Sequence, residues 1–241
     1  TVSQSLAGRA AILELLPLSL NEIAASSSTH IKLNDFLYHG GYPRPYTEKL
    51  DRKIWFNSYI KTYIERDVRA LINIKDLAKF QLFLQLCAGR HGQLLNMSAL
   101  SIECGISHTT VNEWISLLEA SYIIYRLRPF HKNFNKRVTK SAKLYFYDSG
   151  LVCHLLGIDT TETLRLHPYR GAIFEGAIIT EFVKRYFSTG QKAPLYFWRD
   201  SAGHEVDLLV ESGGTLKSYE IKSGETYRPE LLKGLKKWQK I

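Results

Sequence analysis

Cysteine is scarce in this chain of 241 residues, and its spacing excludes two common uses of the residue. The three cysteines, Cys87, Cys104 and Cys153, are odd in number, and no two of them form a CxxC pair. This argues against a disulfide framework and against a zinc ribbon. Each cysteine lies among apolar neighbours, so we expect buried thiols in a reducing compartment.

Long apolar runs and targeting signals are also missing. No apolar run approaches the roughly 20 residues that a helix needs to cross a bilayer. The chain opens at Thr1 without the basic, apolar and small-residue regions of a signal peptide. We therefore expect a cytoplasmic chain that makes no membrane contact, and a fragment that was cut at its front.

The phosphate-binding loop of many nucleotide hydrolases is absent. The pattern G-x-x-x-x-G-K-[ST] occurs nowhere in the sequence. The backbone amides and the lysine of that loop hold the phosphates of ATP. We therefore expect neither ATP binding nor ATP hydrolysis from this chain alone.

Positive charge is what the chain has in excess. Lys and Arg number 32 against 23 Asp and Glu, which gives a formal net charge of +9. An excess of this sign favours an anionic partner such as nucleic acid. The alternative is a basic surface that only keeps the protein in solution, and the bulk charge does not separate the two.

The middle of the chain carries the pattern of a helix-turn-helix. One short helix is predicted from Ser98 to about Cys104, and a turn follows at Gly105-Ile106-Ser107. A second helix starts near His108 and continues through Leu118. Small turns that contain glycine join the two helices of this motif, and Ser107 is a suitable N-cap.

Two short apolar runs after the second helix predict a β-hairpin. They cover residues 122–125 and 144–147, and a basic loop separates them. A helix-turn-helix followed by a hairpin is a winged helix. We place it in a helical and winged-helix-like domain over residues 31–165, after a first segment of residues 1–30.

The hairpin loop concentrates basic residues and contains no Asp or Glu. Its basic residues are Arg126, Arg128, Lys132, Lys136, Arg137, Lys140 and Lys143. Since Lys and Arg contact phosphates, the loop predicts a DNA-binding wing. The alternative is that the hairpin packs against acidic parts of a domain missing from this chain, or that the winged helix binds protein or is purely structural.

The last part of the chain, residues 166–241, changes to an α/β pattern. The predicted elements are a helix over 174–187, strands over 195–198, 205–210 and 218–221, and a final helix that starts near Pro229.

Two of these strands bring together the residues that carry chemistry. Because side chains alternate along a strand, Glu220 and Lys222 share one face and Ile221 points into the core. A hairpin places Asp207 beside Glu220, where the two carboxylates make a site suited to Mg²⁺ or Mn²⁺. The carbonyl of Ile221 is a candidate third ligand. Lys222 is suited to activate water or to stabilise a phosphate, and Glu175 is the candidate fourth catalytic residue.

An aspartate followed by Glu-x-Lys on the next strand resembles the PD-(D/E)XK nuclease-like superfamily. Stretches along nearly the whole chain resemble, as a set, a bacterial and archaeal group of AAA+-superfamily ATPases with a C-terminal domain of unknown function. They are Ser5–Arg9, Leu15–Ser19, Gly40–Pro43, Tyr63–Asp67, Lys143–Leu151, Phe174–Glu175, Tyr196–Arg199, Glu205–Asp207 and Glu220–Lys222.

The resemblance implies that an ATPase core precedes these residues and that residues 1–30 are a remnant of it. In such proteins ATP binds to the core, and the C-terminal part is placed with the nuclease-like fold. The expected fold is thus α+β, with a winged-helix-like region followed by an α/β nuclease-like domain. Two functions follow as alternatives: a DNA-associated, divalent-metal-dependent nuclease, or a non-catalytic interaction module that regulates the ATPase.

Overall fold

The computed structural model describes residues 13–26, 31–48, 50–63, 76–131, 141–224, 226 and 228–240. Within these residues no helix is long and apolar enough to cross a membrane. Four basic residues of the hairpin loop, Lys132, Lys136, Arg137 and Lys140, lie outside the described residues, as does most of residues 1–30.

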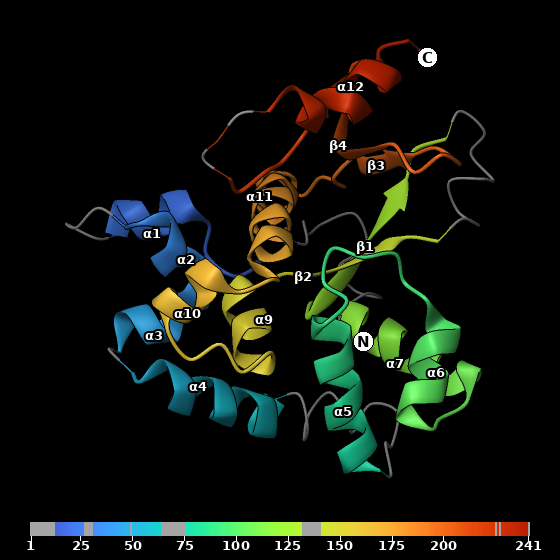
Figure 1. The fold of residues 1–241 in the computed structure, drawn as a ribbon. Helices are drawn as coiled ribbons and strands as arrows, with labels where there is room; N and C mark the ends of the chain where they lie inside the picture. The colour runs from blue at the N-terminus through green and yellow to red at the C-terminus, as the bar shows by residue number, and fades with distance from the viewer. Residues whose placement is uncertain are drawn as a thin grey trace, which may run out of the picture.

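Helices dominate the first two thirds of the chain, as the sequence predicts (Figure 1). Their bounds are α1 (Leu20–Ser26), α2 (Leu33–His39), α3 (Pro43–Thr47), α4 (Arg52–Tyr59), α5 (Leu77–Ala88), α6 (Met97–Cys104), α7 (His108–Ala120), α9 (Ser149–Leu155) and α10 (Thr161–Leu166). Helix α1 lies within the first segment, residues 1–30.

The predicted helix-turn-helix is confirmed as α6 and α7. Asn96 caps α6 by accepting from the amide of Ala99 at 3.0 Å. Gly105 ends the helix with a φ of 60°, a left-handed conformation that glycine adopts without steric cost. Ser107 then caps α7 by accepting from the amide of Thr110 at 3.0 Å. Gly105 and Ser107 thus place the end of α6 and the start of α7 where the sequence predicts them.

A mixed sheet joins the middle and the end of the chain. Its strands are β1 (Ile124–Pro129), β2 (Lys143–Phe146), β3 (Leu195–Arg199), β4 (Glu205–Ser212) and β5 (Thr215–Tyr219), in the spatial order β2-β1-β3-β4-β5. Strand β1 pairs antiparallel with β2 and parallel with β3. The predicted hairpin is therefore not a free wing, because the last residues of β1 also pair with β3 of the C-terminal region.

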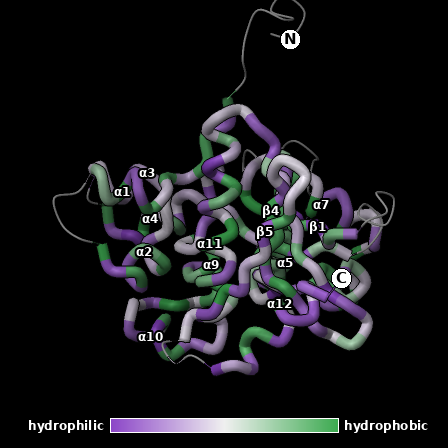
Figure 2. Tube along the Cα trace, turned by 90° about the horizontal axis from the view of Figure 1, so that it is seen from above, coloured by the Kyte–Doolittle hydropathy of each residue, from purple (hydrophilic) through white to green (hydrophobic). Residues whose placement is uncertain are grey.

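The long helix α11 (Arg170–Phe187) lies at the centre of the molecule, between the helical region and the sheet (Figure 1). Ile179 and Val183 of α11 pack against Leu208 and Val210 of β4. On another part of the sheet, Val206 packs with residues of the C-terminal helix α12 (Lys233–Trp238), which follows the 3₁₀ turn η2 (Pro229–Leu232). Coloured by hydropathy, the last described residues after α12 are hydrophilic (Figure 2).

The prediction of three buried thiols is confirmed: Cys87, Cys104 and Cys153 are free and buried. Burial raises the pKa of the Cys153 thiol to about 12, and it also raises the pKa of the other two. A raised pKa leaves little thiolate at neutral pH, so these cysteines act as small apolar side chains.

Candidate active site

The hairpin of β4 and β5 brings Asp207 and Glu220 together. Leu208 pairs with Tyr219 in this antiparallel ladder, so the next pair along it is Asp207 and Glu220. Strand β5 ends at Tyr219, so Glu220 and Lys222 lie just beyond the strand rather than on it. The predicted side-chain directions hold, because Ile221 is buried and Lys222 contacts Glu220.

A β-bulge shapes the strand that carries Asp207. Tyr196 of β3 lies opposite Leu209, whereas Trp198 lies opposite Val206, so Asp207 and Leu208 together face a single residue of β3. Strict alternation predicts Val206 and Leu208 on one face. The bulge instead sends Val206 toward α12 and Leu208 toward α11.

Lys222 joins the two carboxylates. Its ammonium lies 2.8 Å from Oδ2 of Asp207 and 2.6 Å from Oε1 of Glu220. Oδ2 of Asp207 also accepts from the amide of Ile221 at 2.7 Å. Partial burial lowers the pKa of Lys222, but its hydrogen bonds to the two carboxylates outweigh burial and raise that pKa overall. Lys222 therefore stays protonated at neutral pH.

Glu220 retains an unused oxygen. Its Oε2 atom is buried and has no hydrogen-bond partner among the described residues. Burial raises the pKa of Glu220, and the charge of Asp207 raises it further. A buried acceptor without a donor is costly, so this atom points to a missing cation or donor at the site.

A second buried ion cluster lies next to this pair. The ammonium of Lys143, at the start of β2, lies 3.0 Å from Oε1 of Glu175 and 2.5 Å from Oε1 of Glu205. The hydroxyl of Tyr145 donates to the same Glu175 oxygen at 2.5 Å. Lys143 thus lies in the interior and not on an exposed wing, which corrects its prediction as a nucleic-acid contact.

Glu175 links the two clusters electrostatically. Burial raises its pKa, the charge of Lys143 lowers it, and the charge of Asp207 raises it. Glu175, Ile221 and Lys222 also line a pocket of about 480 Å³. Its other lining residues are Gly171, Ser223, Gly224, Thr226, Arg228 and Leu231. The predicted catalytic residue Glu175 is therefore near the pair, but it is held by Lys143.

The residues at the hairpin fit one divalent ion of the Mg²⁺ or Mn²⁺ type. Two carboxylates and the carbonyl of Ile221 are hard oxygen ligands, and the unpaired Oε2 of Glu220 is available to such an ion. No group of three or more His, Cys, Asp or Glu side chains in the described part of the chain is arranged to hold a metal. An ion would therefore also need water or substrate oxygens, as Mg²⁺ often does.

The two other described basic residues of the hairpin, Arg126 and Arg128, differ in their surroundings. Arg126 makes a two-pronged ion pair with Glu119, at 2.8 Å and 2.5 Å. The side chain of Arg128 is exposed, and it also interacts with another group of the protein. On α7, His108, Thr109, Asn112 and Glu113 are exposed and Thr110 is half-buried. Helices α6 and α7 contain no Lys or Arg.

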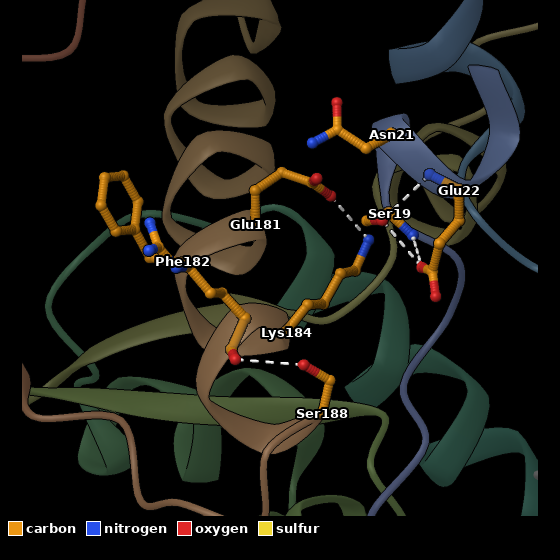
Figure 3. Close-up of a pocket in the computed structure, with 8 residues that line it drawn as sticks. Ser19, Asn21, Glu22, Glu181, Phe182, Lys184 and Ser188 are labelled. Atoms are coloured by element: carbon orange, nitrogen blue, oxygen red, sulfur yellow. Dashed lines mark hydrogen bonds and ion pairs between the residues drawn. The ribbon is translucent and has the colours of Figure 1, made fainter. Parts of the chain in front are cut away.

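A separate pocket of about 410 Å³ lies between α1 and α11 (Figure 3). Lys184 pairs with Glu181 at 2.9 Å and donates to the carbonyl of Leu18 at 2.8 Å. Glu22 accepts from the hydroxyl of Ser19 at 2.7 Å. The polar groups named here already bind one another and stabilise the contact between the two helices. We therefore do not treat this pocket as a candidate site.

Sequence reasoning missed Tyr145 and Glu205 as members of the cluster. A signal for both was present, because Lys143 and Tyr145 are two residues apart on one strand, as are Glu205 and Asp207 on another. Residues two apart point to the same face of a strand. The long-range contact of these two strand faces is not visible in the sequence.

The fold and the site define a mixed α+β protein with a buried cluster of carboxylates and lysines. Residues 30–162 match the family described as "Domain of unknown function (DUF8612)". This match covers more than half of the chain, so the chain belongs to that family. Residues 170–241 match a second family, described as "Domain of unknown function (DUF4143)".

The relatives found by sequence comparison carry the name "Uncharacterized protein". One from Mycobacterium tuberculosis and one from Mycobacterium bovis are each 31% identical over 226 residues, covering 93% of this chain and 49% of the relative. A protein from Haemophilus influenzae is 25% identical over 166 residues, covering 63% of this chain and 41% of the relative. The chain thus spans about half the length of these mycobacterial relatives. No solved structure matches it.

Proposed function

We propose that this chain is part of a DNA-associated AAA+-type ATPase and that its Asp207 site hydrolyses phosphodiesters with the help of a divalent ion. The observation that carries the proposal is the convergence of Asp207, Glu220 and Lys222 beside a pocket, with Oε2 of Glu220 buried and unpaired. The length of the relatives leaves room for the ATPase core that the resemblance implies.

The order of elements supports a PD-(D/E)XK nuclease-like fold for residues 166–241. Helix α11, the antiparallel strands β3, β4 and β5, and helix α12 follow one another as that resemblance requires. Helices α6 and α7 with the paired strands β1 and β2 support a winged-helix-like region. Fold alone does not establish function, so the proposal rests on the side chains of the site.

Each residue of the site has a distinct role in the proposal. When bound, Mg²⁺ or Mn²⁺ supplies charge that polarises the phosphodiester and acidifies a water. Asp207, Glu220 and the Ile221 carbonyl would hold it. Lys222, which is 40% exposed at the pocket, would stabilise charge on a phosphate oxygen. Arg228 and Thr226 line the same pocket and are suited to a nucleic-acid backbone.

Metal binding should appear as a rise in the melting temperature. An ion that binds the folded state alone stabilises it by about 2.7 kcal/mol at 100 times its Kd. Millimolar Mn²⁺ should therefore raise the melting temperature of the wild type, and Asp207→Ala should abolish the rise. Asp200→Ala is the matched control, since Asp200 is paired with His204 and not with the site.

A second candidate function is a non-catalytic interaction module. The described helix-turn-helix favours it, because α6 and α7 carry acidic residues but no basic ones. Ile102 of α6 is also 81% exposed. An acidic helix pair with an exposed apolar residue is poorly suited to a phosphate backbone and better suited to a protein partner.

A salt series separates the two candidates. In the DNA-associated protein, duplex affinity should fall steeply with salt, and Lys136→Glu with Arg137→Glu should weaken binding and reduce the salt slope by about 2. Lys53→Glu with Lys61→Glu controls for net charge. If wild type and loop variant bind equally weakly with one slope, the hairpin is not a DNA contact and the interaction module is the better account.

A further inference from the structure

Lys143 is the most deeply buried lysine among the described ion pairs, and it comes from the other family domain. Its side chain is 5% exposed, against 40% for Lys222. It belongs to the residues that match the DUF8612 family, whereas its partners Glu175 and Glu205 belong to the DUF4143 match. The candidate active site is thus assembled from both domains.

The surroundings of the ammonium are those of a bound cation. Carboxylate oxygens of Glu175 and Glu205 approach it from α11 and β4, and the ring of Phe197 lies 5.6 Å away. The ion pairs keep Lys143 charged, because the charges of Glu175 and Glu205 raise its pKa against the lowering effect of burial. A fixed positive charge is therefore built in on the Asp207 face of β4, because Glu205, which binds Lys143, is two residues from Asp207 on that strand.

Each of the two carboxylate pairs thus binds one lysine, but the two lysines differ in their exposure. Lys222 is partly exposed at a pocket, so its ammonium can leave Asp207 and Glu220 when an ion enters. The side chain of Lys143 is buried, so its ammonium cannot move into solvent in the same way. Some nucleases hold two divalent ions side by side, and here two ammonium groups, those of Lys222 and Lys143, each lie between two carboxylates. Of these two cation positions, the one at Lys143 stays filled by the chain itself.

We propose that Lys143 takes the place of a second divalent ion, so that the site binds one metal ion and is completed by a positioning residue from the DUF8612 domain. A catalytic role for this arrangement rests on the proposed function, but the test below measures metal binding and does not need cleavage. Removing the ammonium should open a second metal position between Glu175 and Glu205. From their present distances of 2.5 Å and 3.0 Å to the ammonium, the oxygens of Glu205 and Glu175 need to move by about 0.4 Å and about 0.9 Å to reach the metal–oxygen distance of about 2.1 Å.

Counting bound Mn²⁺ per chain tests the proposal. The count is made by equilibrium dialysis on wild type, Lys143→Ala, Lys143→Arg and Lys184→Ala. We expect Lys143→Ala to bind one more ion than wild type, and the added Glu205→Gln to remove it. Lys143→Arg keeps a cation and should keep the wild-type count. Lys184→Ala is the matched control, since Lys184 is also a largely buried lysine, paired with Glu181.

The outcomes separate the two proposals. A wild-type count of zero with a count of one for Lys143→Ala would overturn the proposed function and retain the role of Lys143. A folded Lys143→Ala variant with the wild-type count would overturn the role of Lys143. If Lys143→Ala is unfolded without metal, refolding by millimolar Mn²⁺, lost with Glu205→Gln, supports the proposal, and failure to refold contradicts it.

Discussion

Lys143→Met is expected to lower the free energy of unfolding by about 3 kcal/mol, because removing one partner of a buried ion pair leaves an uncompensated charge. Methionine fills much of the volume of lysine, so the loss reports the charge and not a cavity. Glu205 keeps Arg199 at 3.5 Å, whereas the hydroxyl of Tyr145 is the one hydrogen-bond donor that Glu175 keeps among the described residues. The carboxylate of Glu175 therefore carries most of the loss.

The loss should depend on pH. Burial already raises the pKa of Glu175 in the folded protein, and Lys143 holds it down. Without Lys143 this pKa rises further above its unfolded value. The folded variant then binds protons more readily than the unfolded chain, so its stability falls as pH rises through that interval. The deficit relative to wild type should be larger near about pH 8 than near about pH 5.

Urea denaturation at the two pH values measures this effect. Adding Glu175→Gln to Lys143→Met should recover much of the loss and flatten its pH dependence, since no buried charge then remains unpaired. A Lys143→Met variant as stable as wild type at both pH values would mean that the buried cluster does not hold the two domains together.

The sequence predicts local structure well where short-range physics decides it. The helix-turn-helix follows from Gly105 and Ser107, whose turn and cap preferences need no distant contact. Asp207 and Glu220 lie opposite each other because a hairpin joins their strands. Its turn, Gly213-Gly214, has positive φ at both residues, as glycine allows. In both places the pattern and the backbone preference agree.

Long-range pairing is what the sequence does not reveal. A basic run beside a helix-turn-helix predicts a wing, yet β1 pairs with β3 and Lys143 turns inward to two glutamates. Nothing near Lys143 in the sequence distinguishes it from the exposed Arg128. The bulge opposite Phe197 is equally invisible, because it depends on how β3 and β4 pair.

The second large effect concerns cleavage. Asp207→Ala should reduce Mn²⁺-dependent hydrolysis of DNA to background, because it removes a carboxylate that would hold the ion. Lys222→Met should lower the rate by about 10²–10³, the usual cost of removing one group that stabilises transition-state charge.

The two variants should differ in metal binding. Lys222→Met should bind Mn²⁺ more tightly than wild type, because its ammonium no longer competes for Asp207 and Glu220.

The most direct measurement is therefore cleavage of single-stranded and duplex DNA by purified wild type, Asp207→Ala and Asp200→Ala, with Mn²⁺ and with a chelator. The proposed function predicts cleavage by wild type and Asp200→Ala that needs Mn²⁺ and is absent in Asp207→Ala. Equal cleavage by Asp207→Ala and wild type, or no cleavage by a wild type that binds Mn²⁺ and DNA, would contradict it.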